Sequence, residues 1–202
     1  MPTRRAGSNY WQVITAICTI RDSRIQYGVL KPQDVVVLLK LAIPESPVSY
    51  LELAHELGIS GSEVHAAVRR AHKAGLLNIS TFRPKRAALL EFIVHGLKYV
   101  FPGERGGSTR GLPTTFAAPP LKQHFLSKPL VGISARRVQV WPDPEGEVRG
   151  DELKPLYRSV PKAAKNDPKL YELLVLVDAI RAGGARERHL AEEELTKRLG
   201  AA

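Results

Sequence analysis

Apolar side chains recur at helical spacing through the first part of the chain. Residues 9–21 place five of them on one face of a predicted helix, namely Tyr10, Val13, Ile14, Ile17 and Ile20. We expect this apolar face to be buried, either against the protein's own core or in a homodimer interface. A second helix is predicted over residues 33–42, because Pro32 suits a first helical position and Pro44 and Pro47 follow the apolar run.

Two further helices, each started by a serine, come next. Ser49 and Ser60 are each followed three residues later by a glutamate, which is the spacing of a capping box. The predicted helices cover Tyr50–Leu57 and residues 61–74. Gly58 lies between them, where glycine can adopt the positive φ of a sharp turn.

The apolar pattern of this helix pair resembles the helix-turn-helix of DNA-binding regulators. The matching positions are Leu53, Leu57, Ile59, Val64 and Ala67, with the small Ala54 at the crossing and Gly58 in the turn. Over residues 31–86 the chain is similar to the winged subclass, in which two strands follow the second helix. One strand is predicted over residues 77–82, but Pro84 interrupts the next, so the wing is short or absent. Short helix pairs also serve as protein–protein modules, and that alternative stays open.

The rest of the chain mixes helices, a long loop and a short β element. Residues 86–99 predict a long buried helix. Residues 101–120 are rich in glycine and proline and predict a loop, either a flexible arm that touches DNA or a cover over a partner surface. A strand or hairpin is predicted over residues 130–141, followed by a turn-rich connector. Two helices follow, one opened by Pro168 and one over Ala185–Leu199, expected to be a lid, a dimer element or a protein-binding surface.

These elements predict a mainly α (α+β) fold, in which a winged helix-turn-helix domain carries an additional C-terminal region with a short β element and two helices. The expected division is a helical extension over residues 1–30, the winged domain over 31–100, a basic Gly/Pro-rich loop over 101–129 and the C-terminal region over 130–202.

Composition excludes several classes of protein. Apolar residues make up 44% of the 202 residues and charged residues 25%, as in folded globular domains. No apolar run has the length of a membrane-spanning helix, and the N-terminal stretch does not read as a secretory signal. The single cysteine, Cys18, excludes a disulfide framework. We expect a cytoplasmic protein that does not contact a membrane.

The net charge of +10 is concentrated in the middle of the chain. Residues 58–142 hold 13 Lys and Arg against three Glu, whereas the remaining residues are balanced. When cations on one protein surface contact a phosphate backbone, the counterions of the nucleic acid are released, and this release favours binding. A nucleic acid is therefore the expected partner. The alternative is a solvated basic face that only keeps the protein soluble.

Catalytic and metal-binding patterns are missing from the sequence. The six histidines lack the paired spacing with glutamate of a helical zinc site. The glycine-rich stretch lacks the lysine and spacing of a P-loop, and no serine stands in a nucleophile elbow. We expect no enzyme, no cofactor and no metal site.

The resemblance implies which residues contact double-stranded DNA. In a helix-turn-helix the second helix enters the major groove, which makes Ser62, His65 and Arg69 the base readers. Basic residues nearby or in the glycine-rich loop are expected at phosphates, namely Arg70, Lys73, Arg83, Lys85, Arg86, Arg105 and Arg110. The predicted function is that of a sequence-specific transcriptional regulator that acts as a homodimer. The alternative is the antitoxin of a toxin–antitoxin pair, which autoregulates its operon and binds the toxin through residues after Phe101.

Overall fold

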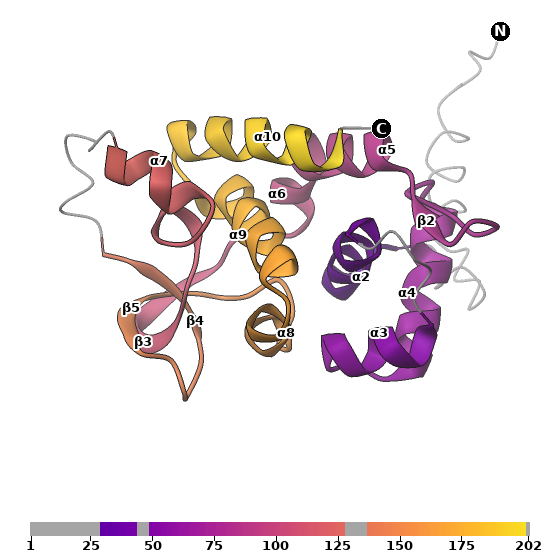
Figure 1. Ribbon diagram of the computed structural model, residues 1–202, viewed down its shortest axis with the longest axis horizontal. Coiled ribbons are helices and arrows are strands. Elements are labelled where there is room, and N and C mark those ends of the chain that lie inside the picture. Colours follow the sequence, from indigo (N-terminus) through magenta and orange to yellow (C-terminus); the bar gives the residue numbers. More distant parts are fainter. Residues whose placement is uncertain (1–28, 44–48, 128–136, 201–202) are drawn as a thin grey trace, which may run out of the picture.

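The computed structural model describes residues 29–43, 49–127 and 137–200. The described chain is mainly helical and has two small sheets, which confirms the α+β class (Figure 1). Within these residues, no helix combines the length and apolar character needed to cross a bilayer. The helix predicted over residues 9–21, including Cys18, lies outside the described residues.

The first three helices follow the sequence pattern closely. They are α2 (Pro32–Ala42), α3 (Tyr50–Leu57) and α4 (Gly61–Lys73). The Ser49 capping box forms in both directions, because the Ser49 hydroxyl accepts from the Glu52 backbone N–H and the Glu52 carboxylate accepts from the Ser49 backbone N–H. Thus the predicted start of α3 is confirmed.

The turn between α3 and α4 depends on glycine. Gly58 has φ 61° and ψ 39°, in the left-handed region that side chains with a Cβ rarely adopt. Ser60 then caps α4 by accepting from the Glu63 backbone N–H. The Glu63 carboxylate does not return this bond as the capping box predicts, because it is bound to Arg70 instead.

A small hairpin follows α4. Strand β1 (Leu77–Asn78) pairs antiparallel with β2 (Arg83–Pro84), so that Leu77 lies opposite Pro84. The sequence predicts a wing that is short or absent because of Pro84, and the structure has a hairpin of two-residue strands in which Pro84 is paired. A two-residue strand at an edge loses only one ladder donor to a proline, which edge strands tolerate.

One continuous helical stretch comes after the hairpin, as predicted for residues 86–99. It consists of α5 (Arg86–Glu91), a π-helical turn η2 (Phe92–Gly96) and α6 (Leu97–Val100). One face is fully buried through Leu89 and Ile93, which places this stretch in the core.

The prediction of a long loop over residues 101–120 is wrong. That region contains strand β3 (Arg105–Pro113) and the 3₁₀ turn η3 (Thr115–Ala117), and α7 (Leu121–Ser127) follows. Strand β3 pairs antiparallel with both β4 (Gln139–Pro142) and β5 (Val148–Leu153). Because β3 is rich in glycine, its sequence lacks the alternation of apolar and polar residues that is typical of a strand. Its strand character depends on pairing with these distant partners.

The three strands close into a small barrel-like sheet, because β4 also pairs with β5 in parallel. Glycine is required where the backbones meet. A Cβ on Gly111 would lie 1.9 Å from the Trp141 carbonyl oxygen, and one on Gly146 would lie 2.4 Å from the Gly111 Cα. The connector predicted after Pro142 is therefore shorter than expected, since β5 begins at Val148.

The C-terminal helices differ in burial, since one of them lies in the core and the last packs over it with many exposed residues. They are α8 (Val160–Asn166), which the sequence pattern did not predict, α9 (Pro168–Ala182) and α10 (Ala185–Leu199). Every residue of α9 from Leu173 to Ile180 is buried. In Figure 1, α9 lies between α2 on one side and the β3–β4–β5 sheet on the other, with α10 across it.

The buried side chains form one hydrophobic cluster. It includes residues of α2, α3 and α4 together with residues of α9 and α10, so the core extends across the boundary expected at residue 100. The four-part division of the chain stays a prediction.

A buried polar group joins α9 to its neighbours. The Asp178 carboxylate accepts hydrogen bonds from Trp141 Nε1, Thr114 Oγ1 and Arg181 Nη1. Arg181 Nε in turn donates to the Phe101 carbonyl oxygen at 2.7 Å. Burial raises the pKa of Asp178, and the three donors oppose that rise because they favour the ionised form.

We predict that Asp178→Ala lowers the free energy of unfolding by about 3–5 kcal/mol, because it leaves the Arg181 charge and the Trp141 N–H without their buried acceptor. Urea unfolding followed by circular dichroism measures the change. Asp151→Ala is the control, since the Asp151 carboxylate forms an exposed pair with Arg137 at 3.5 Å, and its cost stays below about 1 kcal/mol. Equal losses in both variants would contradict the role of Asp178.

Candidate nucleic-acid interface

The outer face of α4 carries four polar side chains in a row. Ser62, His65, Arg69 and Lys73 are all exposed and recur every three or four residues, which places them on one side of the helix. The helix has 13 residues and is therefore about 20 Å long. Two of these four side chains, Arg69 and Lys73, are cationic.

A hollow of about 570 Å³ runs along this face. His65, Arg69 and Lys73 line it from α4, and Ile79 lines it from the tip of the β1–β2 hairpin. Ile79 is 45% exposed and adds apolar surface to the hollow. The helix face and the hairpin tip thus border the same concave surface.

An aromatic contact fixes the edge of this surface. The Tyr50 ring lies 5.5 Å from the His65 ring and 5.0 Å from the Phe82 ring, measured between centroids. Phe82 has φ 55°, a left-handed conformation that costs a non-glycine residue energy. Tyr50 at the start of α3 therefore connects the exposed face of α4 with the hairpin.

Arg70 faces inward, so its prediction as an outward phosphate contact is wrong. Its side chain is 8% exposed, and its Nε and Nη2 donate to the two carboxylate oxygens of Asp34 at 2.8 and 2.6 Å. Asp34 lies on α2 and is fully buried. The hydrogen bonds to Asp34 hold the pKa of Arg70 well above its usual value. Arg70 therefore holds α4 against α2.

The acidic residue of α4 belongs to the same cluster. Glu63 accepts from Arg70 Nη2 at 2.5 Å and from Gln33 Nε2 at 3.0 Å. Burial alone would raise the pKa of Glu63, but these two donors lower it. The negative charge of Glu63 is thus offset within the protein and weakens the positive face of α4 little.

Arg86 is also engaged inside the protein. Its guanidinium donates to the carbonyl oxygens of Ala42 at 3.1 Å and Arg198 at 3.4 Å, which joins the ends of α2 and α10. The structure does not bring it to the α4 face. Lys85 next to it is exposed, and Arg83 lies half-buried in β2 opposite Asn78.

Arg105 and Arg110 lie on strand β3, at the opposite end of the molecule from α4 (Figure 1). Arg105 Nη2 donates to the Ala182 carbonyl oxygen at the end of α9 at 2.8 Å. The predicted flexible arm is therefore an ordered strand, and these two arginines do not border the hollow along α4.

No known family model, curated protein or solved structure matches this chain. Within residues 29–43, 49–127 and 137–200, no group of three or more His, Cys, Asp or Glu side chains could hold a metal ion.

Sequence reasoning missed Tyr50, Phe82 and Ile79 as parts of this surface. The three are apolar or aromatic residues at an element boundary or in a turn, positions that a soluble protein usually gives to polar side chains. An exposed aromatic at the start of a capped helix is a signal that could have indicated Tyr50.

We predict that Arg70→Met lowers the free energy of unfolding by about 3–5 kcal/mol, because Asp34 is left buried and without its ionic partner. The neighbouring substitution Arg69→Met is the matched control and changes stability by less than about 0.5 kcal/mol, since Arg69 is exposed. Chemical unfolding of both variants measures the two changes in the free energy of unfolding. A loss in Arg70→Met no greater than in Arg69→Met would overturn the inward assignment.

The ion pair between Asp34 and Arg70 leads to a second prediction about stability. Replacing both ions, in Asp34→Leu with Arg70→Met, should recover most of the stability that the single substitution loses, because an apolar pair of similar volume leaves no buried charge. Failure of the double variant to exceed Arg70→Met would show that the loss has another cause.

Proposed function

We propose that the protein is a sequence-specific double-stranded DNA-binding protein that regulates transcription, with α3 and α4 as a helix-turn-helix and the β1–β2 hairpin as a short wing. The observation that carries this proposal is the row of Ser62, His65, Arg69 and Lys73 on the exposed face of α4, beside the hollow that the hairpin tip borders. A helix about 20 Å long with one polar cationic face suits the major groove.

The proposed roles follow from position on the helix. Ser62 and His65 lie in the first half of α4 and Arg69 in the middle, so these side chains reach base edges, with Arg69 donating to a guanine. Lys73 near the end of α4 and Lys85 after the hairpin contact phosphates on either side of the groove. Arg70 and Arg86 are left out because their guanidinium groups bind within the protein.

Selection from a random duplex library by the full-length protein tests the proposal. We expect one sequence motif to be enriched, and Arg69→Ala to lose preference at one position of that motif by about 1–3 kcal/mol. The control is Arg149→Ala, an exposed arginine on β5, which leaves the motif unchanged. No enriched motif, or equal behaviour of the two variants, would contradict sequence-specific binding by α4.

The phosphate contacts have a separate readout. Lys85→Ala should weaken binding to all sequences alike and reduce the slope of log affinity against log salt by about one, because one fewer counterion is released. Lys162→Ala on α8 serves as the control and keeps the slope of the unsubstituted protein. A change of motif in Lys85→Ala would instead make Lys85 a base reader.

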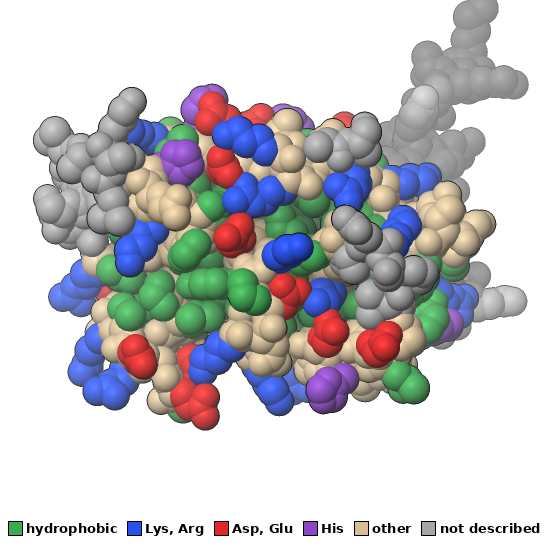
Figure 2. Space-filling view, in the orientation of Figure 1, with side chains coloured by type: hydrophobic (Ala, Val, Ile, Leu, Met, Phe, Trp, Pro, Cys, Tyr) green, Lys and Arg blue, Asp and Glu red, His purple; other side chains and the backbone are tan. Residues whose placement is uncertain are grey.

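The antitoxin alternative is favoured by an apolar surface at the other end of the molecule. Figure 2 shows hydrophobic side chains gathered beside the β3–β4–β5 sheet, in the left half of the view. A separate observation is a hollow of about 320 Å³ lined by the half-buried Phe116 and Val148 and by the buried Phe125, all of which come after Phe101. Exposed apolar patches suit protein partners.

Copurification from the native host tests this second candidate. We expect a stoichiometric partner that Phe116→Glu releases while DNA binding is retained. Recovery of the protein without any partner, with DNA binding intact, would favour a regulator that is not part of a toxin–antitoxin pair.

A further inference from the structure

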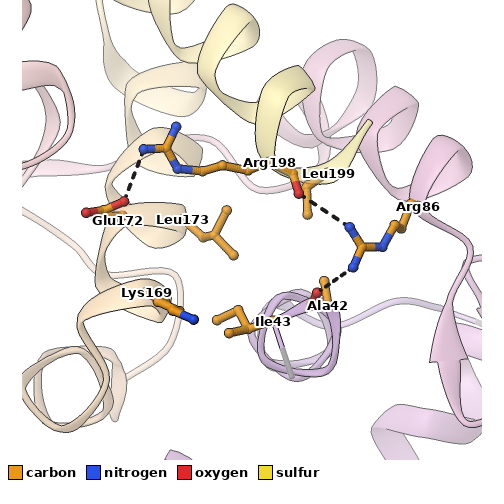
Figure 3. A pocket seen from close by; sticks show the side chains of 8 residues that line it. All are labelled: Ala42, Ile43, Arg86, Lys169, Glu172, Leu173, Arg198 and Leu199. Atoms are coloured by element: carbon orange, nitrogen blue, oxygen red, sulfur yellow. Dashed lines mark hydrogen bonds and ion pairs between the residues drawn. The ribbon is translucent and has the colours of Figure 1, made fainter. Parts of the chain in front are cut away.

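A pocket of about 250 Å³ lies where α2, α5, α9 and α10 meet (Figure 3). Its apolar lining comes from Ile43 at the end of α2, Leu173 on α9 and Leu199 on α10. Leu173 is 4% exposed and Leu199 1%, so this lining belongs to the edge of the hydrophobic core. The pocket therefore has an apolar floor at the edge of the core and is open to solvent on its other side.

Cations dominate the polar part of the pocket. Arg86, Lys169 and Arg198 line it together with one acidic residue, Glu172. Figure 3 shows Lys169 extending its ammonium group across the pocket toward Ile43. The polar lining thus has an excess of positive charge beside an apolar floor.

The three cations are not equivalent. Within the part of the chain that the structure describes, Arg86 donates to the carbonyl oxygens of Ala42 and Arg198, which carry partial charges and do not fully offset its positive charge. Arg198 is paired with Glu172 at 3.1 Å and with Glu194. The positive charge that faces the pocket therefore comes mainly from Arg86 and Lys169.

We propose that this pocket binds a small organic carboxylate with an apolar body. An apolar floor with a few convergent polar groups is the usual composition of a ligand site. The body packs against Ile43, Leu173 and Leu199, and the carboxylate is bound by Lys169, since charge-assisted hydrogen bonds to a carboxylate are the strong ones. The positive charge of Arg86, whose guanidinium stays bound to the two carbonyls, adds to the attraction. The volume lies below the range typical of drug-sized ligands, so the ligand is limited to one ring or a short chain.

Calorimetry of the full-length protein with benzoate, benzamide and benzylamine tests the charge requirement. The three probes share a ring but are anionic, neutral and cationic. We expect benzoate to bind at one site and at least tenfold more tightly than the other two. Equal binding of the three probes, or no binding of benzoate at millimolar concentration, would overturn the proposal.

Variants locate the site. Lys169→Glu should weaken benzoate binding at least tenfold, and Glu172→Gln should strengthen it by removing a competing carboxylate. Lys162→Glu reverses an exposed charge on α8 outside the pocket and should have no effect. If Lys162→Glu weakens binding as much as Lys169→Glu, the effect is one of net charge and the pocket is not the site.

Amide chemical shifts provide a readout that does not depend on affinity. Benzoate should shift the backbone signals of Ile43, Leu173 and Leu199 and leave those of the α4 face unchanged. Shifts confined to α4 would place the anion on the proposed DNA surface and overturn the pocket assignment. No DNA is present in these measurements, so their outcome is independent of the proposed regulatory function.

Discussion

The ion pair between Arg70 and Asp34 is the constraint on which the candidate site depends. A charged group without exposure to water persists only when it is paired and fully hydrogen-bonded, and Asp34 accepts from Arg70 twice and from the Lys31 backbone N–H. This bidentate geometry fixes both the distance and the rotation between α2 and α4. The rotation decides that Arg69, one residue earlier, points outward.

The two ends of α2 connect different parts of the molecule. Its first turn is bound to α4 through Asp34, and its last residues contact Arg86 and border the pocket with α9 and α10. Between these ends, the residues from Val35 to Leu39 are all buried. The candidate recognition helix is thus joined to the C-terminal helices through a single rigid element.

Local sequence rules predicted the helices well because their determinants lie within a few residues of each other. Ser49 and Ser60 located the starts of α3 and α4, Gly58 the turn, and Pro168 the start of α9. The outward positions Ser62, His65, Arg69 and Lys73 followed from the same periodicity. Strand β3 was missed because its identity comes from pairing with residues 27 to 48 positions away, from Pro113↔Val140 to Arg105↔Leu153, and its glycines are required by close backbone contact and not by a loop.

The errors at Arg70 and Arg86 have a common physical origin. Both are basic residues whose partners, a carboxylate on α2 and the carbonyls at two helix ends, are distant in the sequence. No local sequence pattern distinguishes an arginine that binds phosphate from one that donates hydrogen bonds to oxygens inside the protein. Charge counted along the chain therefore overestimates the positive charge available at the surface.

Because α9 is buried on all sides along residues 173–180, the two halves of the chain unfold together. A helix enclosed by α2, α8, α10 and the region of η3 offers no surface along which one half of the chain could detach from the other. Amide hydrogens of α2 and α9 would then exchange with solvent only when the whole protein opens. The lifetime of the folded α4 face would equal that of the entire molecule, so a shortened chain without α9 would not retain it.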